Sequence, residues 1–471
     1  MDNAALIRAL QAIVGEQHVL HSPADLAAYA YDATPLFRSL PDVVVFPGST
    51  AEVQAILRHA SAHKVPVVTR GSGTNLSGGT LPLQGGIVLV MTRMNRILEI
   101  DAANLTATVE TGANTLALAR EVEARGLFYP PDPGSMAVST IGGNVAENAG
   151  GLRGLKYGVT RDYVMGLEAV LASGEVIRTG GKNAKDVAGY DLTRLLVGSE
   201  GTLAVITEVT LKLLPKPQTK RSCLAIFDAL EPAARTVARI IENQVIPCTL
   251  EFMDSGTIEA VEAFARVGLP TDAEAVLFIE QDGPQSVVDA DIELVSRICQ
   301  EEGARAVKVA ATPDEGTKLA EARRFALSAL ARLRPTTVLE DATVPRSRLA
   351  EMVRFIGETA VKYNLRISTF GHAGDGNLHP TCLCDERDHD EIHRVEQAFE
   401  EIFDKALSMG GTITGEHGVG VAKQDFLEWK IGAEGVEVSR RLKAAFDPAG
   451  ILNPGKVLPK ATRKRLVVKQ G

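Results

Sequence analysis

The sequence predicts an α+β fold with short strands, divided into more than one domain. Three observations support this. The 471 residues suggest about three domains at roughly 150 residues each. Hydrophobic residues make up 45% and charged residues 23%, as in globular chains. Short apolar runs alternate irregularly with helical patterns, without the repeated βαβ array of a parallel α/β fold.

Charge and composition narrow the range of partners. Lys and Arg number 50 against 59 Asp and Glu, a net charge of −9 that argues against a nucleic-acid partner. Apolar runs such as 87–91 are far shorter than the ~20 residues of a membrane span, and the N-terminus lacks a signal-peptide pattern. Five cysteines, with no metal-cluster motif around Cys382 and Cys384, are too few for a disulfide framework. We therefore expect reduced thiols and a cytoplasmic protein.

The N-terminal part reads as strand, helix, strand and a glycine-rich loop. Ser49 to Glu52 has capping-box spacing, and apolar residues with helical spacing follow it. A strand at 65–69 runs into the glycine-rich residues 70–79. The elements expected around and after this loop are strands at 43–46, 87–91, 97–100, 107–110 and 203–214, and a helix at 114–125.

The pattern changes after Pro215-Lys216-Pro217, which reads as a boundary because two prolines stop a strand. Residues 221–282 predict strand, long helix, helix and strand. The later expected elements are helices at 287–303, 346–364 and 389–409, a strand at 366–370, a polar loop at 371–379, a glycine-flanked loop at 415–418 and a turn at 451–456.

Three glycine clusters, at 71–79, 134–158 and 198–202, indicate a large cofactor. Backbone approaches a phosphate closely only where side chains are absent, and successive N–H groups bind anions. The first cluster lacks the Gly-Lys-Ser/Thr of an ATP-binding loop and the helix of a Rossmann fingerprint. Together the clusters predict one polar cofactor wrapped by backbone.

A second constellation combines histidines and a glutamate. His372 and His379 flank a tight turn, and Glu416-His417 lies in another glycine-flanked loop. Two histidines and a carboxylate form a three-ligand set with an open position, as in catalytic metal sites. A hydrogen-bonded structural cluster is the alternative that the residue types leave open. Nitrogen and oxygen ligands suit Zn²⁺, and also Fe²⁺ or Mn²⁺.

The glycine clusters resemble a known flavin fold. Residues 67–75 look like the pyrophosphate loop of FAD-binding domains of the vanillyl-alcohol oxidase and para-cresol methylhydroxylase type, and residues 131–151 and 198–203 resemble its second and third loops. Over about 10–458 the chain is similar to FAD-linked D-2-hydroxy-acid dehydrogenases, which act on glycolate, D-lactate or D-2-hydroxyglutarate.

The resemblance implies an FAD domain at 1–216 with a helical lead-in at about 1–36, and an α+β substrate-binding cap domain at 217–430. It also implies a C-terminal return at 431–458, followed by a basic tail at 459–471. No histidine stands in the first loop, so the FAD is expected to be non-covalent. The implied cofactor-binding residues are Arg70, Gly71, Ser72, Gly73, Thr74, Asn75, Gly78, Gly79, Pro131, Asp132, Gly134, Ser135, Thr140, Gly142, Gly143, Asn144, Asn148, Gly150, Gly151, Gly158, Glu200, Gly201, Val205, Ile206 and Asn453.

The resemblance also implies roles in catalysis. The metal ligands would be His372, His379 and Glu416, with zinc most suited, and the catalytic residues would be His417 as base, Arg323 for the substrate carboxylate and Asn377. Arg324 is the alternative to Arg323, and a solvated helix face is the alternative role for both.

The expected reaction is FAD-dependent oxidation of a small D-2-hydroxy acid, glycolate or D-lactate. Leu339 stands where some D-2-hydroxyglutarate dehydrogenases carry a lysine, which disfavours a dicarboxylate. A metal-dependent hydrolase and a non-catalytic FAD subunit are the rival interpretations. Electrons must leave the flavin, so a separate acceptor is expected: an iron–sulfur subunit, an electron-transferring flavoprotein or a quinone-linked protein at the membrane. A homo- or hetero-oligomer is expected as well.

Overall fold

The chain passes between two units more than once. The computed structural model describes residues 2–460, and within them the first unit comprises residues 2–149, Val159–Lys216 and 416–460. The second comprises Gly150–Gly158 and Pro217–Gly415. Most of the basic tail expected at 459–471 lies outside the described residues. The functional domains at 1–216, 217–430 and 431–458 stay a prediction.

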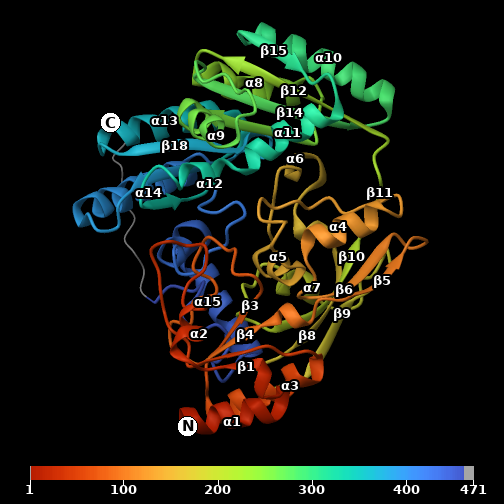
Figure 1. The fold of residues 1–471 in the computed structure, drawn as a ribbon, viewed down its shortest axis with the longest axis vertical. Coiled ribbons are helices and arrows are strands. Elements are labelled where there is room, and N and C mark those ends of the chain that lie inside the picture. Colours follow the sequence, from red (N-terminus) through yellow and green to blue (C-terminus); the bar gives the residue numbers. More distant parts are fainter. Residues whose placement is uncertain (1, 461–471) are drawn as a thin grey trace. The chain divides into compact units, whose positions relative to one another are not determined.

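A four-stranded sheet in the first unit positions the first glycine loop. Its order is β1-β2-β4-β3, with β2, β4 and β3 parallel. The strands are β1 (Val19–Leu20), β2 (Val43–Val45), β3 (Val67–Arg70) and β4 (Ile87–Val90). Helices α1 (Asn3–Val14) and α3 (Thr50–His63) pack together beside it (Figure 1). The predicted cap of α3 is confirmed, since the Glu52 N–H donates to Ser49 Oγ at 3.3 Å.

A five-stranded antiparallel sheet completes the first unit, in the order β5-β6-β10-β8-β9. Its strands are β5 (Ile97–Asp101), β6 (Thr106–Glu110), β8 (Val164–Val170), β9 (Val176–Gly180) and β10 (Val205–Lys212). Strands β7 (Leu127–Phe128) and β11 (Leu214–Pro215) pair separately. The other helices of this unit are α2 (Pro23–Ala27), α4 (Thr115–Glu123), α5 (Ile141–Glu147), α7 (Leu192–Leu196) and α15 (Leu427–Phe446).

The second unit is built on one antiparallel sheet in the order β15-β12-β14-β13-β18-β19-β16, with β17 also paired to β19. Its strands are β12 (Thr219–Phe227), β13 (Thr249–Asp254), β14 (Ala275–Gly283), β15 (Ala306–Val309), β16 (Thr336–Leu339), β17 (Ala342–Thr343), β18 (Arg366–His372) and β19 (Asn377–Cys384).

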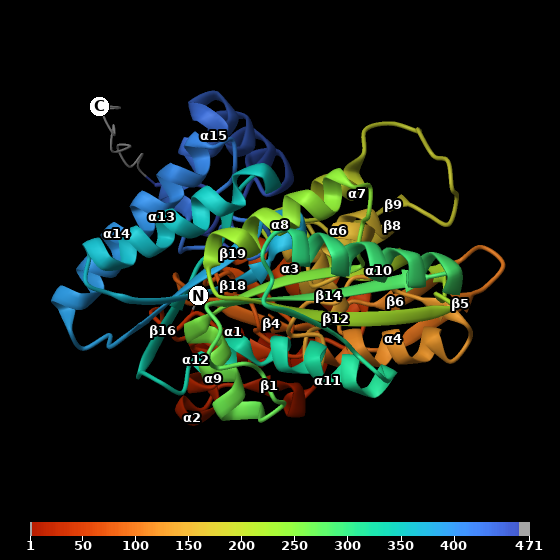
Figure 2. The ribbon, with the colours of Figure 1, turned by 90° about the horizontal axis from the view of Figure 1, so that it is seen from above.

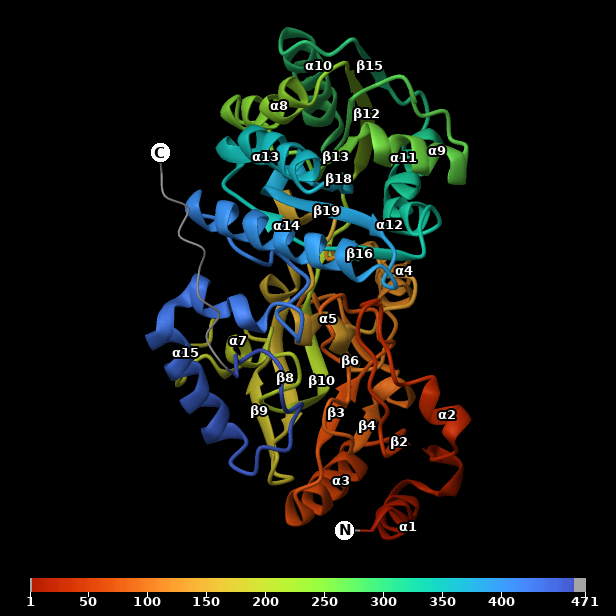
Figure 3. The ribbon, with the colours of Figure 1, turned by 90° about the vertical axis from the view of Figure 1, so that its left-hand side faces the viewer.

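Helices cover both faces of this sheet (Figures 2 and 3). One layer contains α8 (Leu230–Glu242), α10 (Gln285–Glu301) and α13 (Leu349–Lys362), and α14 (His389–Ser408) packs on α13. The other contains α9 (Ser255–Ala265), α11 (Pro313–Arg324) and α12 (Ala326–Leu330). The short α6 (Gly154–Tyr157) also belongs to this unit.

Two sequence-based expectations about the second unit are wrong. Residues 221–282 contain a third strand, β13, where only helices were expected between two strands. The predicted loop at 371–379 is a tight β18–β19 hairpin, with only a 3-10 turn at Ala373–Asp375. In both places charged or polar side chains are buried and paired inside the sheet, so polarity is a misleading sign of a solvated loop. Within the described residues, no helix is long and apolar enough to cross a membrane.

Candidate active site

The first glycine loop begins where β3 ends, and its glycines are sterically required. A Cβ on Gly71 would lie 2.3 Å from Thr140 Oγ1, and one on Gly73, whose φ is +73°, would lie 2.1 Å from the Arg70 guanidinium. Arg70 Nη1 donates to the carbonyl of Tyr31 at 2.6 Å, and burial lowers the pKa of this arginine. The loop therefore has a fixed path, because the side chains of Thr140 and Arg70 leave no room for a Cβ at these two glycines.

Two residues missed by the sequence analysis anchor this loop. The Asn75 amide and the Thr80 hydroxyl both donate to the Asp32 carboxylate, at 3.0 and 3.2 Å. The Gly78 N–H donates to Thr34 Oγ1 at 2.7 Å. No local sequence signal marks Asp32 and Thr34, because both precede the loop by about 40 residues.

The second loop meets the first. Ser72 Oγ donates to the carbonyl of Val138 at 2.5 Å, and Thr140 caps α5 by accepting the Gly143 N–H. A Cβ on Gly142 would fall 1.6 Å from Thr111 Oγ1, so this glycine is required for packing. A Cβ on Gly134 would meet nothing within 4 Å, so backbone there faces open space. Exposed backbone beside two converging loops fits a bound dinucleotide such as FAD.

Asn453 ties the third loop to the first, because its amide donates to the carbonyls of Gly79 and Glu200, each at 2.8 Å. The Glu200 N–H in turn donates to Ala146 in the second loop. Most predicted cofactor residues belong to the first unit, including Pro131, Asp132, Ser135, Thr74, Asn144, Asn148, Gly201, Val205 and Ile206. Gly150, Gly151 and Gly158 instead lie in the short segment Gly150–Gly158, which belongs to the second unit.

The third loop also forms hydrogen bonds with the backbone that follows Glu416. Both oxygens of Glu200 accept backbone N–H groups, from Val419 and Gly420, each at 2.7 Å. A Cβ on Gly418 would approach Glu147 Oε2 to 2.3 Å. Burial and then the charge of Glu200 raise the pKa of Glu147.

The β18–β19 hairpin positions the two predicted metal-binding histidines in the second unit. Phe370 faces His379 and His372 faces Asn377 across the strands. The imidazole centroids of His372 and His379 are 5.1 Å apart, and both side chains are buried.

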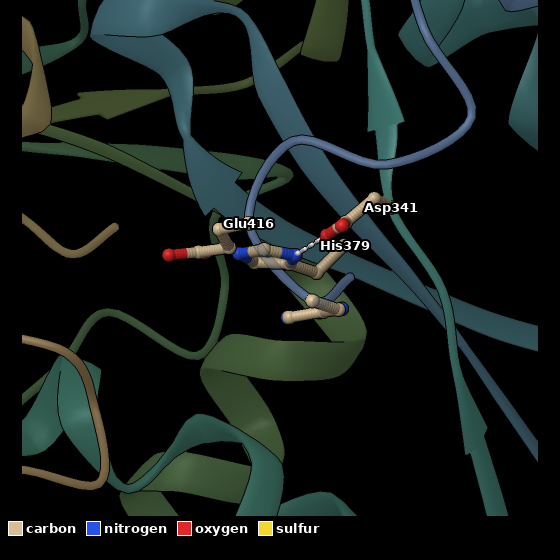
Figure 4. A group of neighbouring side chains, drawn as sticks. Asp341, His379 and Glu416 are labelled. Atoms are coloured by element: carbon tan, nitrogen blue, oxygen red, sulfur yellow. Dashed lines mark ion pairs between the residues drawn. The ribbon is translucent and has the colours of Figure 1, made fainter. Parts of the chain in front are cut away.

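A carboxylate oxygen lies close to the Nδ1 atom of each of these histidines. His372 Nδ1 lies 2.7 Å from Glu251 Oε1. His379 Nδ1 lies 3.2 Å from Asp341 Oδ1, the pair that is joined by a dashed line in Figure 4. A carboxylate on one ring nitrogen is the common arrangement for metal-ligating histidines. Neither acid lies near its histidine in the sequence, so no local pattern predicted this role for Glu251 or Asp341.

Asp341 also fixes the start of the Glu416-His417 segment. Its Oδ2 accepts the Thr414 hydroxyl at 2.9 Å and the Gly415 N–H at 3.0 Å. One ligand atom from each of Asp341, His379, Glu416 and His417 lies within 4.8 Å of the others. This nitrogen and oxygen donor set fits a divalent cation. It contains the predicted ligands His379 and Glu416 and also the predicted base His417, but the predicted ligand His372 is not part of it.

Arg323 is buried, not on a solvated face. Its side chain is 5% exposed, Nη2 lies 2.6 Å from Glu251 Oε2, and its Cζ stacks 4.6 Å from the Phe370 ring centroid. Arg324 is only half-buried. Asn377 is buried in β19 and accepts the Thr343 hydroxyl at 2.7 Å, so its amide plane is fixed.

These features define a flavoprotein class, and comparisons support it. Residues 41–180 match the family described as FAD binding domain, and 216–457 match FAD linked oxidases, C-terminal domain. The chain superposes on p-cresol methylhydroxylase with a TM-score of 0.81, covering 96% of both chains at 19% identity. The predicted vanillyl-alcohol oxidase and para-cresol methylhydroxylase type of fold is confirmed.

The chain belongs to the FAD-linked oxidase family and is an FAD-linked oxidoreductase. It is 59% identical to glycolate oxidase subunit GlcD of Bacillus subtilis, over 97% of both chains. It is 38% identical to a D-lactate dehydrogenase of Anaerostipes hadrus, over 89% of this chain and 90% of that one.

Proposed function

We propose that the protein oxidises a small D-2-hydroxy acid, glycolate or D-lactate, to the 2-oxo acid. The observation that carries this proposal is the 59% identity to glycolate oxidase subunit GlcD along nearly the whole chain. Leu339 is buried and apolar at the position where a lysine would favour D-2-hydroxyglutarate, the alternative substrate.

We propose that His372, His379 and Glu416 hold a divalent metal, with zinc best suited and iron or manganese as alternatives. When bound, the metal would supply a Lewis acid, and non-covalent FAD in the three glycine loops would supply the two-electron acceptor. The carboxylates of Glu251 and Asp341 lie beside the Nδ1 atoms of His372 and His379, which supports the proposal that these two histidines are ligands.

Three side chains of the protein would bind the substrate, orient it and accept its proton. Arg323 forms an ion pair with the substrate carboxylate, for which a planar guanidinium is suited. Asn377, fixed by Thr343, orients the substrate. The His417 imidazole accepts the proton of the substrate hydroxyl, while the Cα hydrogen leaves as hydride.

We propose a separate electron acceptor: an iron–sulfur subunit, an electron-transferring flavoprotein or a quinone-linked protein. The word subunit in the name of the relatives supports assembly with other chains. All five cysteines are free and buried, in keeping with a cytoplasmic location, and the partner would provide any contact with the membrane.

A substrate screen with a dye as electron acceptor tests the proposal. We expect turnover with glycolate or D-lactate and much less with D-2-hydroxyglutarate or L-lactate. Preference for the dicarboxylate would replace the proposed substrate, and no turnover with any 2-hydroxy acid would refute the proposal.

A further inference from the structure

Glu251 lies at the centre of the sheet in the second unit and has a different partner on each carboxylate oxygen. It lies in β13, paired to β14 on one side and β18 on the other, and its side chain is 1% exposed. Oε1 lies 2.7 Å from His372 Nδ1, and Oε2 lies 2.6 Å from Arg323 Nη2. One buried acid therefore joins a proposed metal ligand to the proposed substrate-binding arginine.

The contact with His372 determines which ring nitrogen carries the proton. An ionised carboxylate only accepts hydrogen bonds, so Nδ1 must be the donor. A neutral imidazole then has its lone pair on Nε2, the nitrogen on the other side of the ring from Glu251. This is the tautomer that a ligand through Nε2 requires.

The contact with Arg323 fixes the plane of the guanidinium. The ion pair holds one edge, and stacking 4.6 Å from the Phe370 ring centroid holds one face. A guanidinium has five N–H donors, so the ion pair with Glu251 uses only part of its hydrogen-bonding capacity. Phe370 also lies across the β18–β19 hairpin from His379. The two restraints on Arg323 therefore come from the adjacent strands β13 and β18.

We propose that Glu251 is a positioning residue that orients the metal ligand His372 and the substrate-binding Arg323 together. This inference rests on the proposed function and deepens it. Because one carboxylate serves both groups, loss of Glu251 must impair metal affinity and substrate binding at the same time, whereas loss of an ordinary buried ion pair would impair only folding.

Glu251→Gln is the most direct test, because it keeps the shape and removes the charge. An amide has one acceptor oxygen and one donor nitrogen, so it cannot accept from both His372 and Arg323. If its NH₂ turns to His372 Nδ1, the ring proton moves to Nε2, the wrong tautomer. If the NH₂ turns to Arg323, two donors face each other.

Glu280→Gln is the matched control. Glu280 is a buried glutamate on the adjacent strand β14, 4% exposed, and it interacts with Lys220 and Ser222 at 2.7 and 2.8 Å. The side-chain partners of Glu280 are a surface lysine and a serine, and neither is a proposed site residue. Its substitution therefore changes a buried glutamate of the same sheet and leaves the contacts of the proposed site unchanged.

The measurements are flavin content, Zn²⁺ affinity by competition with a chelator in the flavin-loaded protein, and KM and kcat for the accepted 2-hydroxy acid. For Glu251→Gln we expect unchanged flavin content, about 10- to 100-fold weaker Zn²⁺ binding and a KM raised about tenfold or more. Glu280→Gln should match wild type in Zn²⁺ affinity and KM.

Wild-type Zn²⁺ affinity and KM in a folded Glu251→Gln variant would overturn the inference. If that variant does not fold, Glu251→Gln combined with Arg323→Leu removes the unpaired arginine, and normal Zn²⁺ affinity there would equally overturn it. A wild-type protein that binds no divalent metal or oxidises no 2-hydroxy acid would refute the proposed function, so the two failures are distinguishable.

Discussion

Asp341 and His379 form a buried carboxylate–imidazole pair, with Oδ1 3.2 Å from Nδ1. The other oxygen of Asp341 accepts the Gly415 N–H, immediately before Glu416. One aspartate therefore orients a histidine of the β18–β19 hairpin and anchors the backbone that carries the next proposed ligand.

Asp341→Asn should weaken metal binding about 10- to 100-fold with FAD retained, because the amide cannot accept from all three of its present neighbours. Metal analysis after dialysis against a graded series of chelator concentrations measures this. Asp254→Asn is a control, since Asp254 is a half-buried aspartate of the same unit that caps α9 and accepts the Thr257 N–H. Equal metal content in both variants and wild type would contradict the role of Asp341.

Arg323→Lys should raise KM, with a smaller effect on kcat, because lysine keeps the charge beside Glu251 but loses the planar fork. A lost charge-assisted hydrogen bond is worth about 1.5–3 kcal/mol, roughly 10- to 150-fold in KM. Steady-state kinetics on Arg323→Lys and the half-buried Arg324→Lys would separate the two candidates. A KM effect confined to Arg324→Lys would transfer the role to that residue.

His417→Asn should keep both FAD and metal and lose about 10²- to 10⁴-fold in kcat, the usual contribution of a general base. Single-turnover rates with metal analysis of the same sample are the measurement. Loss of the metal would make His417 a ligand, and normal turnover would remove it from the mechanism.

The sequence was sufficient to predict the elements whose periodicity is local. The apolar face of α3, Val53, Ile56, Leu57 and Ala60, is fully buried as predicted. The glycine clusters indicated a flavin-binding domain, because close approach of backbone to a cofactor excludes side chains, and the family match over residues 41–180 supports that domain. Contacts such as Glu251 with His372 span more than 100 residues and leave no local pattern. Strand β13 was not predicted, because a glutamate in the sequence suggests a solvated position and only the distant partners of Glu251 allow it to be buried.

Lys456 should make stability depend on pH. It is 4% exposed, its amine donates to Asn453 Oδ1 at 3.2 Å and to the carbonyl of Leu81, and burial lowers its pKa to about 8. The unfolded chain holds this proton up to its ordinary pKa of 10.5, so the unfolded state binds more protons between pH 8 and 10.5. Stability should therefore rise with pH in that window, by about 3 kcal/mol at most at 1.36 kcal/mol per pKa unit.

Lys456→Met removes the titrating group, so its unfolding free energy should lack this rise. Chemical unfolding of both proteins at several pH values across the window gives the comparison. The same pH slope in wild type and variant would show that another group is responsible.

Non-covalent FAD is the expectation from the absence of a histidine in residues 70–79. Acid precipitation should release all the flavin into the supernatant. A protein pellet that stays yellow after washing would contradict this.

Anaerobic mixing of the oxidised flavoprotein with glycolate or D-lactate, with the flavin absorption followed over time, tests the proposed 2-hydroxy-acid oxidation most directly. We expect rapid bleaching of the flavin by one of these acids, formation of stoichiometric 2-oxo acid, and bleaching slowed at least tenfold by chelation of the metal. A flavin spectrum unchanged by every 2-hydroxy acid would contradict it.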